Sequence, residues 1–257
     1  MSEHRHPIFA LWAHPRSMST ALERVMRERG DLDCLHEPFM YDYYIHRQTK
    51  RLPMFQPEAG HPVSYRDVRE TILRRAARGP VFFKDMSYYV MPHLIADTAF
   101  CGRIFHAFIV RDPMASIASY HRLDPDLTLV EIGIEAQWQQ YRALVAQGIC
   151  PVVLMAEDVR ANPPAVIGAY WRKAGLGPAD HAFEWSPDMP QDWRQVAGWH
   201  ADVTTSHGIA PPDAAARARQ AARFAQACKA APRLQKLLDH HRPFHDRFSD
   251  VALHGRT

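Results

Sequence analysis

The feature that most constrains this chain is a short apolar run that leads through a polar turn into an amphipathic helix. Residues 8–12 are apolar throughout, which is typical of a strand buried on both faces of a sheet. His14 and Pro15 then end the run. A helix is predicted to begin at residue 19 or 20, because Thr20 and Glu23 have capping-box spacing and an apolar face follows them. The N-terminus of this helix therefore lies at the carboxyl end of the strand.

The turn between strand and helix carries groups that bind an anion. The first backbone N–H groups of a helix have no partner within it, and the helix dipole is positive at that end. Arg16 adds a full charge, and Ser17, Ser19 and Thr20 add hydroxyl donors on either side of Met18. We interpret the turn as a phosphate or sulfate cradle. An ordinary strand-to-helix turn with hydroxyl caps is the alternative.

The loop differs from that of the nucleotide kinases and resembles that of another family. A Walker A loop needs glycines, and residues 14–20, read HPRSMST, contain none. The stretch resembles the 5′-phosphosulfate loop of the sulfotransferases, in which Lys or Arg follows Pro and Ser and Thr lead into a helix. The resemblance implies that Arg16, Ser17, Met18, Ser19 and Thr20 bind 3′-phosphoadenosine 5′-phosphosulfate (PAPS), with Arg16 also taking part in catalysis.

Further strands and helices alternate along the first two thirds of the chain. Apolar strands are predicted at residues 8–12, 32–35, 81–83, 104–110 and 151–155, with helices at 64–78, from 113, at 129–147 and at 164–174. This order predicts a single α/β domain over residues 1–257. It also predicts a central parallel sheet of about five strands flanked by helices. The resemblance implies that this fold is of the P-loop NTPase-like, sulfotransferase type. Residues 7–155 would form a nucleotide-binding core, 180–212 a loop-rich cover and 213–245 C-terminal helices, starting at Asp213.

Two polar positions follow the second and third predicted strands, on the side where an open parallel sheet binds ligands. Glu37 is a candidate base there, with a solvated acid as the alternative. In the sulfotransferases a Glu-Pro pair occurs at this place and some relatives use the Glu as general base. Lys84 matches a family Lys that contacts the transferring group, with a surface ion pair as the alternative. The family's His is absent, since Asp85 and Met86 follow Lys84, which leaves Glu37 as the predicted base and Asp85 in reserve.

A second anion site is predicted at the end of the fourth strand. Asp112 and Pro113 have the residue types of an N-cap and first helical position, and Ser119 lies eight residues after Arg111. In the sulfotransferases an Arg and a Ser with this spacing bind the 3′-phosphate of PAPS. The resemblance assigns that role to Arg111 and Ser119. A plain Arg-Asp-Pro turn is the alternative.

Aromatic residues outside the strands are the candidates for an acceptor pocket. Residues 41–62 lack a clear period and are interpreted as a loop or lid, with Tyr41 and Tyr44 facing the acceptor or covering the core edge. Tyr88, Trp199 and Asp85 complete the predicted acceptor set. The family's glycine-rich Arg-Lys-Gly loop is absent from 180–212, where Arg194 or a Trp is the candidate substitute.

Charge, cysteine and hydropathy patterns bound the partners. The net charge of +3 and pI near 8.7 suit an anionic ligand but indicate no nucleic-acid surface. Four scattered cysteines predict free thiols in a reducing compartment. Neither a signal peptide nor an apolar span long enough for a bilayer is recognised, so we expect a cytoplasmic protein with no membrane partner. The oligomeric state stays open, a homodimer included.

The resemblance, carried by two motifs in order, implies sulfuryl transfer from PAPS to a hydroxyl or amine of a small-molecule acceptor, without a metal. Arg16, Lys84 and the helix N-terminus would stabilise the charge on the leaving phosphate, and Glu37 would take the acceptor's proton. A P-loop-type phosphotransferase using ATP and Mg²⁺ is the first alternative, disfavoured by the missing glycines. A non-catalytic nucleotide-binding module is the second.

Overall fold

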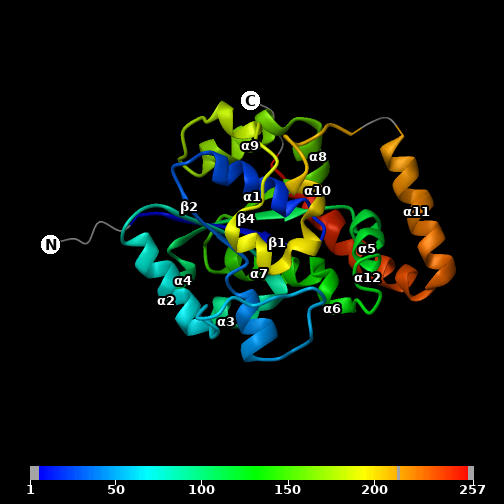
Figure 1. The fold of residues 1–257 in the computed structure, drawn as a ribbon, viewed down its shortest axis with the longest axis horizontal. Helices are drawn as coiled ribbons and strands as arrows, with labels where there is room; N and C mark the ends of the chain where they lie inside the picture. The colour runs from blue at the N-terminus through cyan, green and yellow to red at the C-terminus, as the bar shows by residue number, and fades with distance from the viewer. Residues whose placement is uncertain (1–5, 213–214, 254–257) are drawn as a thin grey trace.

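The computed structural model describes residues 6–212 and 215–253, which form one α/β domain around a five-stranded parallel sheet (Figure 1). The strand order is β2-β3-β1-β4-β5. The bounds are β1 Ile8–Ala13, β2 Asp33–His36, β3 Val81–Met86, β4 Ile104–Val110 and β5 Val152–Met155. The prediction of a single domain with a central parallel sheet is confirmed.

The central strand β1 is buried at every residue, as expected for a strand covered by helices on both faces of a parallel sheet. It pairs with β3 on one side and β4 on the other, so its carboxyl end lies where the strand order reverses. In open parallel sheets, ligands bind at such a point. The loop that follows β1 is therefore placed at the expected ligand site by topology alone.

The third strand is longer than predicted, and this changes the environment of two site residues. Instead of ending at Phe83, β3 continues to Met86, and Lys84 and Asp85 pair with Leu11 and Trp12 of β1. Both polar side chains are therefore fully buried within the sheet. β2, which pairs in parallel with β3 at the edge of the sheet, lies one residue later than predicted, at Asp33–His36.

Helices cover both faces of the sheet, and most of the predicted ones are present. Their bounds are α1 Ser19–Glu28, η1 Asp42–His46, α2 Tyr65–Ala76, α3 Ser87–Ala96, α4 Thr98–Cys101, α5 Pro113–His121, α6 Leu129–Ile132, α7 Ile134–Ala146, α8 Ala156–Ala161, α9 Pro163–Lys173, η2 Asp180–Phe183, η3 Gln191–Trp199, α10 Ala201–Thr204, α11 Ala216–Ala230 and α12 Arg233–Asp250. Ser64 caps α2, and Asp112 caps α5 with Pro113 in its first turn, as predicted. No helix in the described ranges has the length and hydropathy to cross a bilayer.

The predicted capping box at the start of α1 is wrong. Met18 is the N-cap residue, in a left-handed conformation (φ 71°), and no side chain caps the helix. Glu23 is fully buried and turns inward instead of reaching back toward Thr20, because buried donors inside the protein bind its carboxylate. The Thr20 hydroxyl therefore does not cap α1 and can contact groups at the candidate site.

The predicted helix over 129–147 is broken at Gly133, which separates α6 from α7. Gly133 has φ 79°, and a Cβ there would lie 3.1 Å from both His14 Cβ and Tyr88 Cδ1. A side chain would therefore meet the loop after β1 and the wall of the site. Only glycine allows both the backbone angle and this close approach.

The cover segment, residues 180–212, is more ordered than the predicted loop, since η2, η3 and α10 occupy much of it. In Figure 1 its yellow part, containing η3, lies across the sheet in front of β1 and close to α1. The predicted start of the next helix at Asp213 lies outside the described residues. Pro232 separates α11 from α12 as predicted, and both helices pack against α5.

Candidate active site

A cavity lies at the carboxyl ends of β1, β2 and β4, between the loop after β1 and the cover segment. Its floor is formed by residues 15–20 of the cradle loop, residues 14–20, and its walls come from Glu37 after β2, from the end of β3, and from η1, α3, α5, η3 and α10. The lining residues are Pro15, Arg16, Ser17, Met18, Ser19, Thr20, Ala21, Glu37, Tyr44, Leu52, Met86, Tyr88, Tyr89, Arg111, Tyr120, Val196, Trp199, His200, Asp202 and Val203. The cavity therefore combines cationic and hydroxyl groups at one side with aromatic rings at the other.

The cradle loop adopts a strained backbone without glycine. Arg16 (φ 63°) and Met18 (φ 71°) are both left-handed, a conformation that costs most residues about 1–2 kcal/mol. The Ser17 hydroxyl oxygen between them is buried and has no hydrogen-bond partner among the described residues. A buried donor without a partner and the first turn of α1 suit an anionic ligand. The residues present therefore fit the phosphosulfate group that the sequence predicted here.

The structure brings together the two arginines that the sequence placed 95 residues apart. The Arg111 guanidinium donates to the backbone oxygen of Arg16 (Nη1···O 2.8 Å), and Arg16 Nε donates to Ser119 Oγ at 2.9 Å. Burial lowers the pKa of both guanidinium groups, and their mutual repulsion adds to this effect at Arg111. Two half-buried cations and a serine hydroxyl thus converge at one side of the cavity, where an anion would relieve their repulsion.

Arg16 also holds the cover segment to the cradle loop. Its guanidinium donates to the backbone oxygen of Trp199 at 2.7 Å and pairs with Asp202 Oδ2 at 2.9 Å. The Asp202 side chain is 78% exposed, whereas that of Arg16 is 16% exposed. The exposed Asp202 carboxylate therefore pairs with the Arg16 guanidinium, the group that an anionic ligand would contact.

Glu37 lies at the cavity wall directly after β2, with a left-handed backbone (φ 42°). Its Oε1 is hydrogen-bonded to the ammonium of Lys84, and Tyr89 Oη lies 3.4 Å from its Oε2. Lys84 itself is fully buried, does not line the cavity, and has Glu23 Oε2 at 3.8 Å as a second carboxylate. Lys84 therefore contacts Glu37 rather than the space where a transferring group would lie.

Two residues of the predicted acceptor set do not reach the cavity. Tyr41 donates to Gln195 Oε1 at 2.5 Å and stacks on His61, away from the lining residues. Asp85 is fully buried and accepts from the backbone N–H groups of Phe39 (2.7 Å) and Met86 (2.9 Å). The structure therefore does not support an acceptor role for these two side chains: Tyr41 contacts the cover segment, and Asp85 holds the backbone just after β2 and at the end of β3.

Three others of that set, Tyr44, Tyr88 and Trp199, do line the cavity. The candidate substitute Arg194 is exposed and absent from the lining. Ser119 is not among the lining residues, and its hydroxyl oxygen accepts from Arg16 Nε instead.

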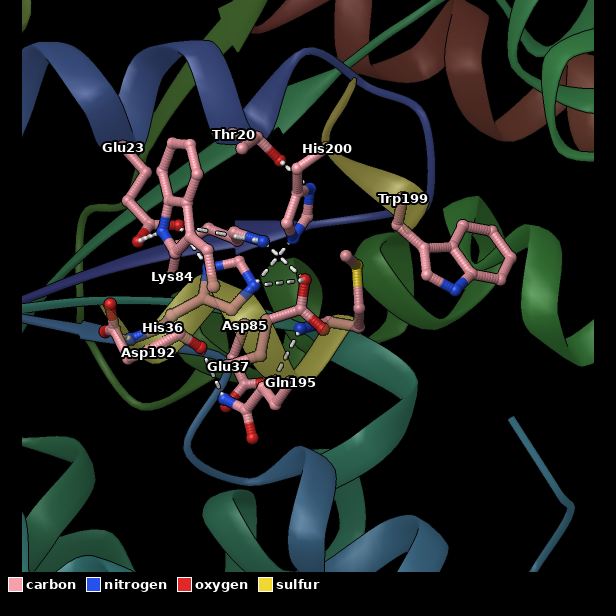
Figure 2. Close-up of polar contacts among 12 residues, drawn as sticks. Thr20, Glu23, His36, Glu37, Lys84, Asp85, Asp192, Gln195, Trp199 and His200 are labelled. Carbon is pink, nitrogen blue, oxygen red and sulfur yellow. Dashed lines mark hydrogen bonds and ion pairs between the residues drawn. The ribbon is translucent and has the colours of Figure 1, made fainter. Parts of the chain in front are cut away.

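Sequence reasoning missed a row of polar groups that runs from the cavity lining at Thr20 and His200 into the protein interior at His36 and Glu23 (Figure 2). Thr20 Oγ1 lies 3.3 Å from His200 Nδ1, His200 Nε2 lies 2.9 Å from His36 Nε2, and His36 Nδ1 lies 2.7 Å from Glu23 Oε2. We call these four residues the histidine chain. Burial lowers the pKa of both histidines well below its ordinary value. Nothing in the sequence signals this row, because its members lie on three elements up to 180 residues apart.

No group of three or more His, Cys, Asp or Glu side chains within residues 6–212 and 215–253 could hold a metal ion.

Comparison with known proteins identifies the family to which this chain belongs. The family model described as "Sulfotransferase domain" matches residues 8–237. The chain belongs to the sulfotransferase domain family. Among solved structures, the sulfotransferase domain from the Synechococcus PCC 7002 olefin synthase aligns with a TM-score of 0.50 at 17% identity, covering 87% of this chain and 95% of that one. This likeness supports the fold.

Two curated relatives of this sulfotransferase domain come from Arabidopsis thaliana. Branched-chain-amino-acid aminotransferase-like protein 2 is 22% identical over 207 residues, and branched-chain-amino-acid aminotransferase-like protein 1 is 21% identical over 215 residues. Each alignment covers 78% of this chain and 36% of the relative. The chain thus spans about a third of the length of these relatives.

Proposed function

We propose that this protein transfers a sulfuryl group from PAPS to a hydroxyl of a small-molecule acceptor. The observation that carries the proposal is the convergence of Arg16, Arg111 and Ser119 at the tip of β1, beside the N-terminus of α1. One nucleotide with an anionic group at each end would meet both predicted anion sites. Membership of the sulfotransferase domain family supports the same reaction class.

The residues of the cavity divide into a donor side and an acceptor side. Arg16 and the hydroxyls of Ser17, Ser19 and Thr20 would hold the phosphosulfate, and Arg111 with Ser119 would hold the 3′-phosphate. Tyr44, Tyr88 and Trp199 offer an aromatic wall for the acceptor. This division places the acceptor next to Glu37, the carboxylate on that wall.

In the proposed reaction the acceptor oxygen forms a bond to sulfur while the bond between sulfur and the bridging phosphate oxygen breaks. The acceptor's proton passes to Glu37 and the products are a sulfate ester and adenosine 3′,5′-bisphosphate. Arg16 and the N–H groups at the start of α1 stabilise the charge that develops on the leaving phosphate, and each such donor lowers the barrier by about 3 kcal/mol. Lys84 holds the Glu37 carboxylate in position through their ion pair.

Calorimetry separates this proposal from the two alternatives. We expect adenosine 3′,5′-bisphosphate to bind without Mg²⁺ and more tightly than ATP does with or without Mg²⁺. Tighter, Mg²⁺-dependent binding of ATP would favour a phosphotransferase instead. An assay with PAPS and a panel of hydroxyl and amine acceptors then tests for an enzyme, because a binding module would retain the nucleotide without turnover.

A further inference from the structure

The histidine chain joins the predicted anion cradle to a buried carboxylate. Thr20 at its outer end lines the cavity, whereas Glu23 at its inner end is fully buried. Trp193 Nε1 at 2.8 Å and Arg27 Nε at 2.9 Å also donate to Glu23 Oε1. Glu23 is thus surrounded by donors, which requires it to act as an acceptor toward His36.

The positions of the protons in the histidine chain follow from Glu23 acting as an acceptor at its inner end. Because Glu23 accepts, His36 carries a proton on Nδ1, and a neutral His36 then has a lone pair on Nε2. His200 must supply the single proton between the two Nε2 atoms, which leaves a lone pair on its Nδ1. Thr20 is therefore the donor in its contact with His200, and its hydroxyl turns only lone pairs toward the cavity.

This arrangement opposes anion binding, because an anionic oxygen needs a donor from Thr20. We propose that an anion bound in the cradle loop is accompanied by uptake of one proton onto the His36–His200 pair. The inference rests on the proposed function, which places the phosphosulfate of the donor against Thr20. It makes His200 and His36 positioning residues that set the direction of the Thr20 hydroxyl.

The proton balance of the step is simple. One proton comes from solvent, and no covalent bond between heavy atoms forms or breaks. With that proton, His36 donates from Nδ1 to Glu23 and from Nε2 to His200, and His200 donates from Nδ1 to Thr20. The Thr20 hydroxyl proton is then free to point at the anion, so every bond in the row remains satisfied.

Charges around the pair explain why the proton arrives with the anion rather than before it. Lys84 on β3 lowers the pKa of both histidines, Arg27 on α1 lowers that of His36, and Arg16 lowers that of His200, while burial has the largest effect on each. Glu37 raises the pKa of His36 and Glu23 that of His200. Asp192 is the further carboxylate here, accepting from the His36 backbone N–H at 3.2 Å. An anion beside Thr20 adds the negative charge that tips this balance toward the imidazolium.

The experiment counts protons taken up when adenosine 3′,5′-bisphosphate binds. Titration calorimetry at one pH in several buffers of different ionisation enthalpy gives the number of protons per ligand, independent of affinity. Thr20→Val removes the hydroxyl that contacts His200. Ser17→Ala is the matched control, because it removes a cradle hydroxyl that has no hydrogen-bond partner among the residues that the structure describes.

We expect the wild type and Ser17→Ala to take up about one proton more per ligand than Thr20→Val. The same difference makes the wild-type affinity fall about tenfold more per pH unit as the pH rises. Equal proton counts for wild type and Thr20→Val would overturn this inference while leaving donor binding intact. Failure of the nucleotide to bind at all would contradict the proposed function and this inference with it.

A spectroscopic readout tests the starting state. Long-range ¹H–¹⁵N spectra of the histidine rings should show two neutral rings in the ligand-free protein, with His36 protonated at Nδ1 and His200 at Nε2. Saturating adenosine 3′,5′-bisphosphate should shift one ring to the imidazolium form. An imidazolium already present without ligand would overturn the inference.

Discussion

The cradle loop and the histidine chain share Thr20, but their other members come from different kinds of sequence. The cradle loop is a single stretch of seven residues that runs from the end of β1 into the first turn of α1, completed by a second strand-to-helix junction at Arg111. The histidine chain takes its members from α1, β2 and the junction of η3 with α10. Local segments thus supply the groups expected to touch the ligand, and long-range packing supplies the groups that orient them. Removing the first kind should reduce the rate, and removing the second kind should reduce stability.

The largest expected effect is on turnover when the predicted base is removed. Glu37→Gln should lower kcat by about 100- to 10,000-fold, since a positioned general base contributes that much. Binding of adenosine 3′,5′-bisphosphate should be retained, because Glu37 lies on the acceptor side of the cavity. Steady-state kinetics and calorimetry measure the two quantities separately, and a thermal melt checks that the unpaired Lys84 has not unfolded the variant. Loss of donor binding with intact folding would mean that Glu37 has another role.

Arg16→Ala should lower kcat by about 100- to 1000-fold, because it removes the cation closest to the predicted leaving phosphate. Arg194→Ala is the control, since Arg194 is exposed and lies outside the cavity lining. A near wild-type rate for Arg16→Ala would remove this residue from the mechanism.

Glu23→Gln tests the histidine chain and should mainly lower the stability of the folded protein. Its carboxylate is fully buried and accepts from His36, Trp193 and Arg27, so losing its charge should lower the free energy of unfolding by about 3 kcal/mol. Glu28→Gln removes a partly exposed partner of Arg24 on the same helix and should cost less than about 1 kcal/mol. Urea unfolding of both variants measures the difference. Equal losses would show that the buried row contributes no more than a surface ion pair.

The smallest expected effect is a gain in affinity for adenosine 3′,5′-bisphosphate. Asp202→Asn releases Arg16 from an exposed ion pair and should tighten adenosine 3′,5′-bisphosphate binding by up to about fivefold. Asp188→Asn is the matched control, because Asp188 pairs with Arg24 and is also largely exposed. Weaker binding of Asp202→Asn in calorimetry would indicate that Asp202 orders the cover segment rather than competing with the ligand.

The sequence predicted the fold because the relevant signals are local. Apolar runs located all five strands, and the Asp112-Pro113 pair located the start of α5. The errors have local causes too: Lys84 and Asp85 look like a strand end, and only pairing with β1 shows that the strand continues. Likewise, a Thr and a Glu with three-residue spacing resemble a capping box when the buried partners of Glu23 are unknown.

The candidate site was predictable where a residue follows a strand and unpredictable where the cover segment completes it. Arg16, Arg111 and Glu37 each follow a strand closely, so parallel topology alone brings them to one edge. His200 and Asp202 reach the same edge through the packing of η3 and α10, to which no sequence period points. Their contacts with Thr20 and Arg16 span more than 175 residues.

The left-handed backbone at Met18 adds strain to the cradle loop but also limits the conformations that the loop can adopt. Glycine adopts this conformation freely, so Met18→Gly should relieve about 1 kcal/mol of strain in the folded loop. The same change would let the loop sample many more conformations, and binding a nucleotide would then require ordering it again. A loop that holds its shape without glycine has already met that ordering cost during folding.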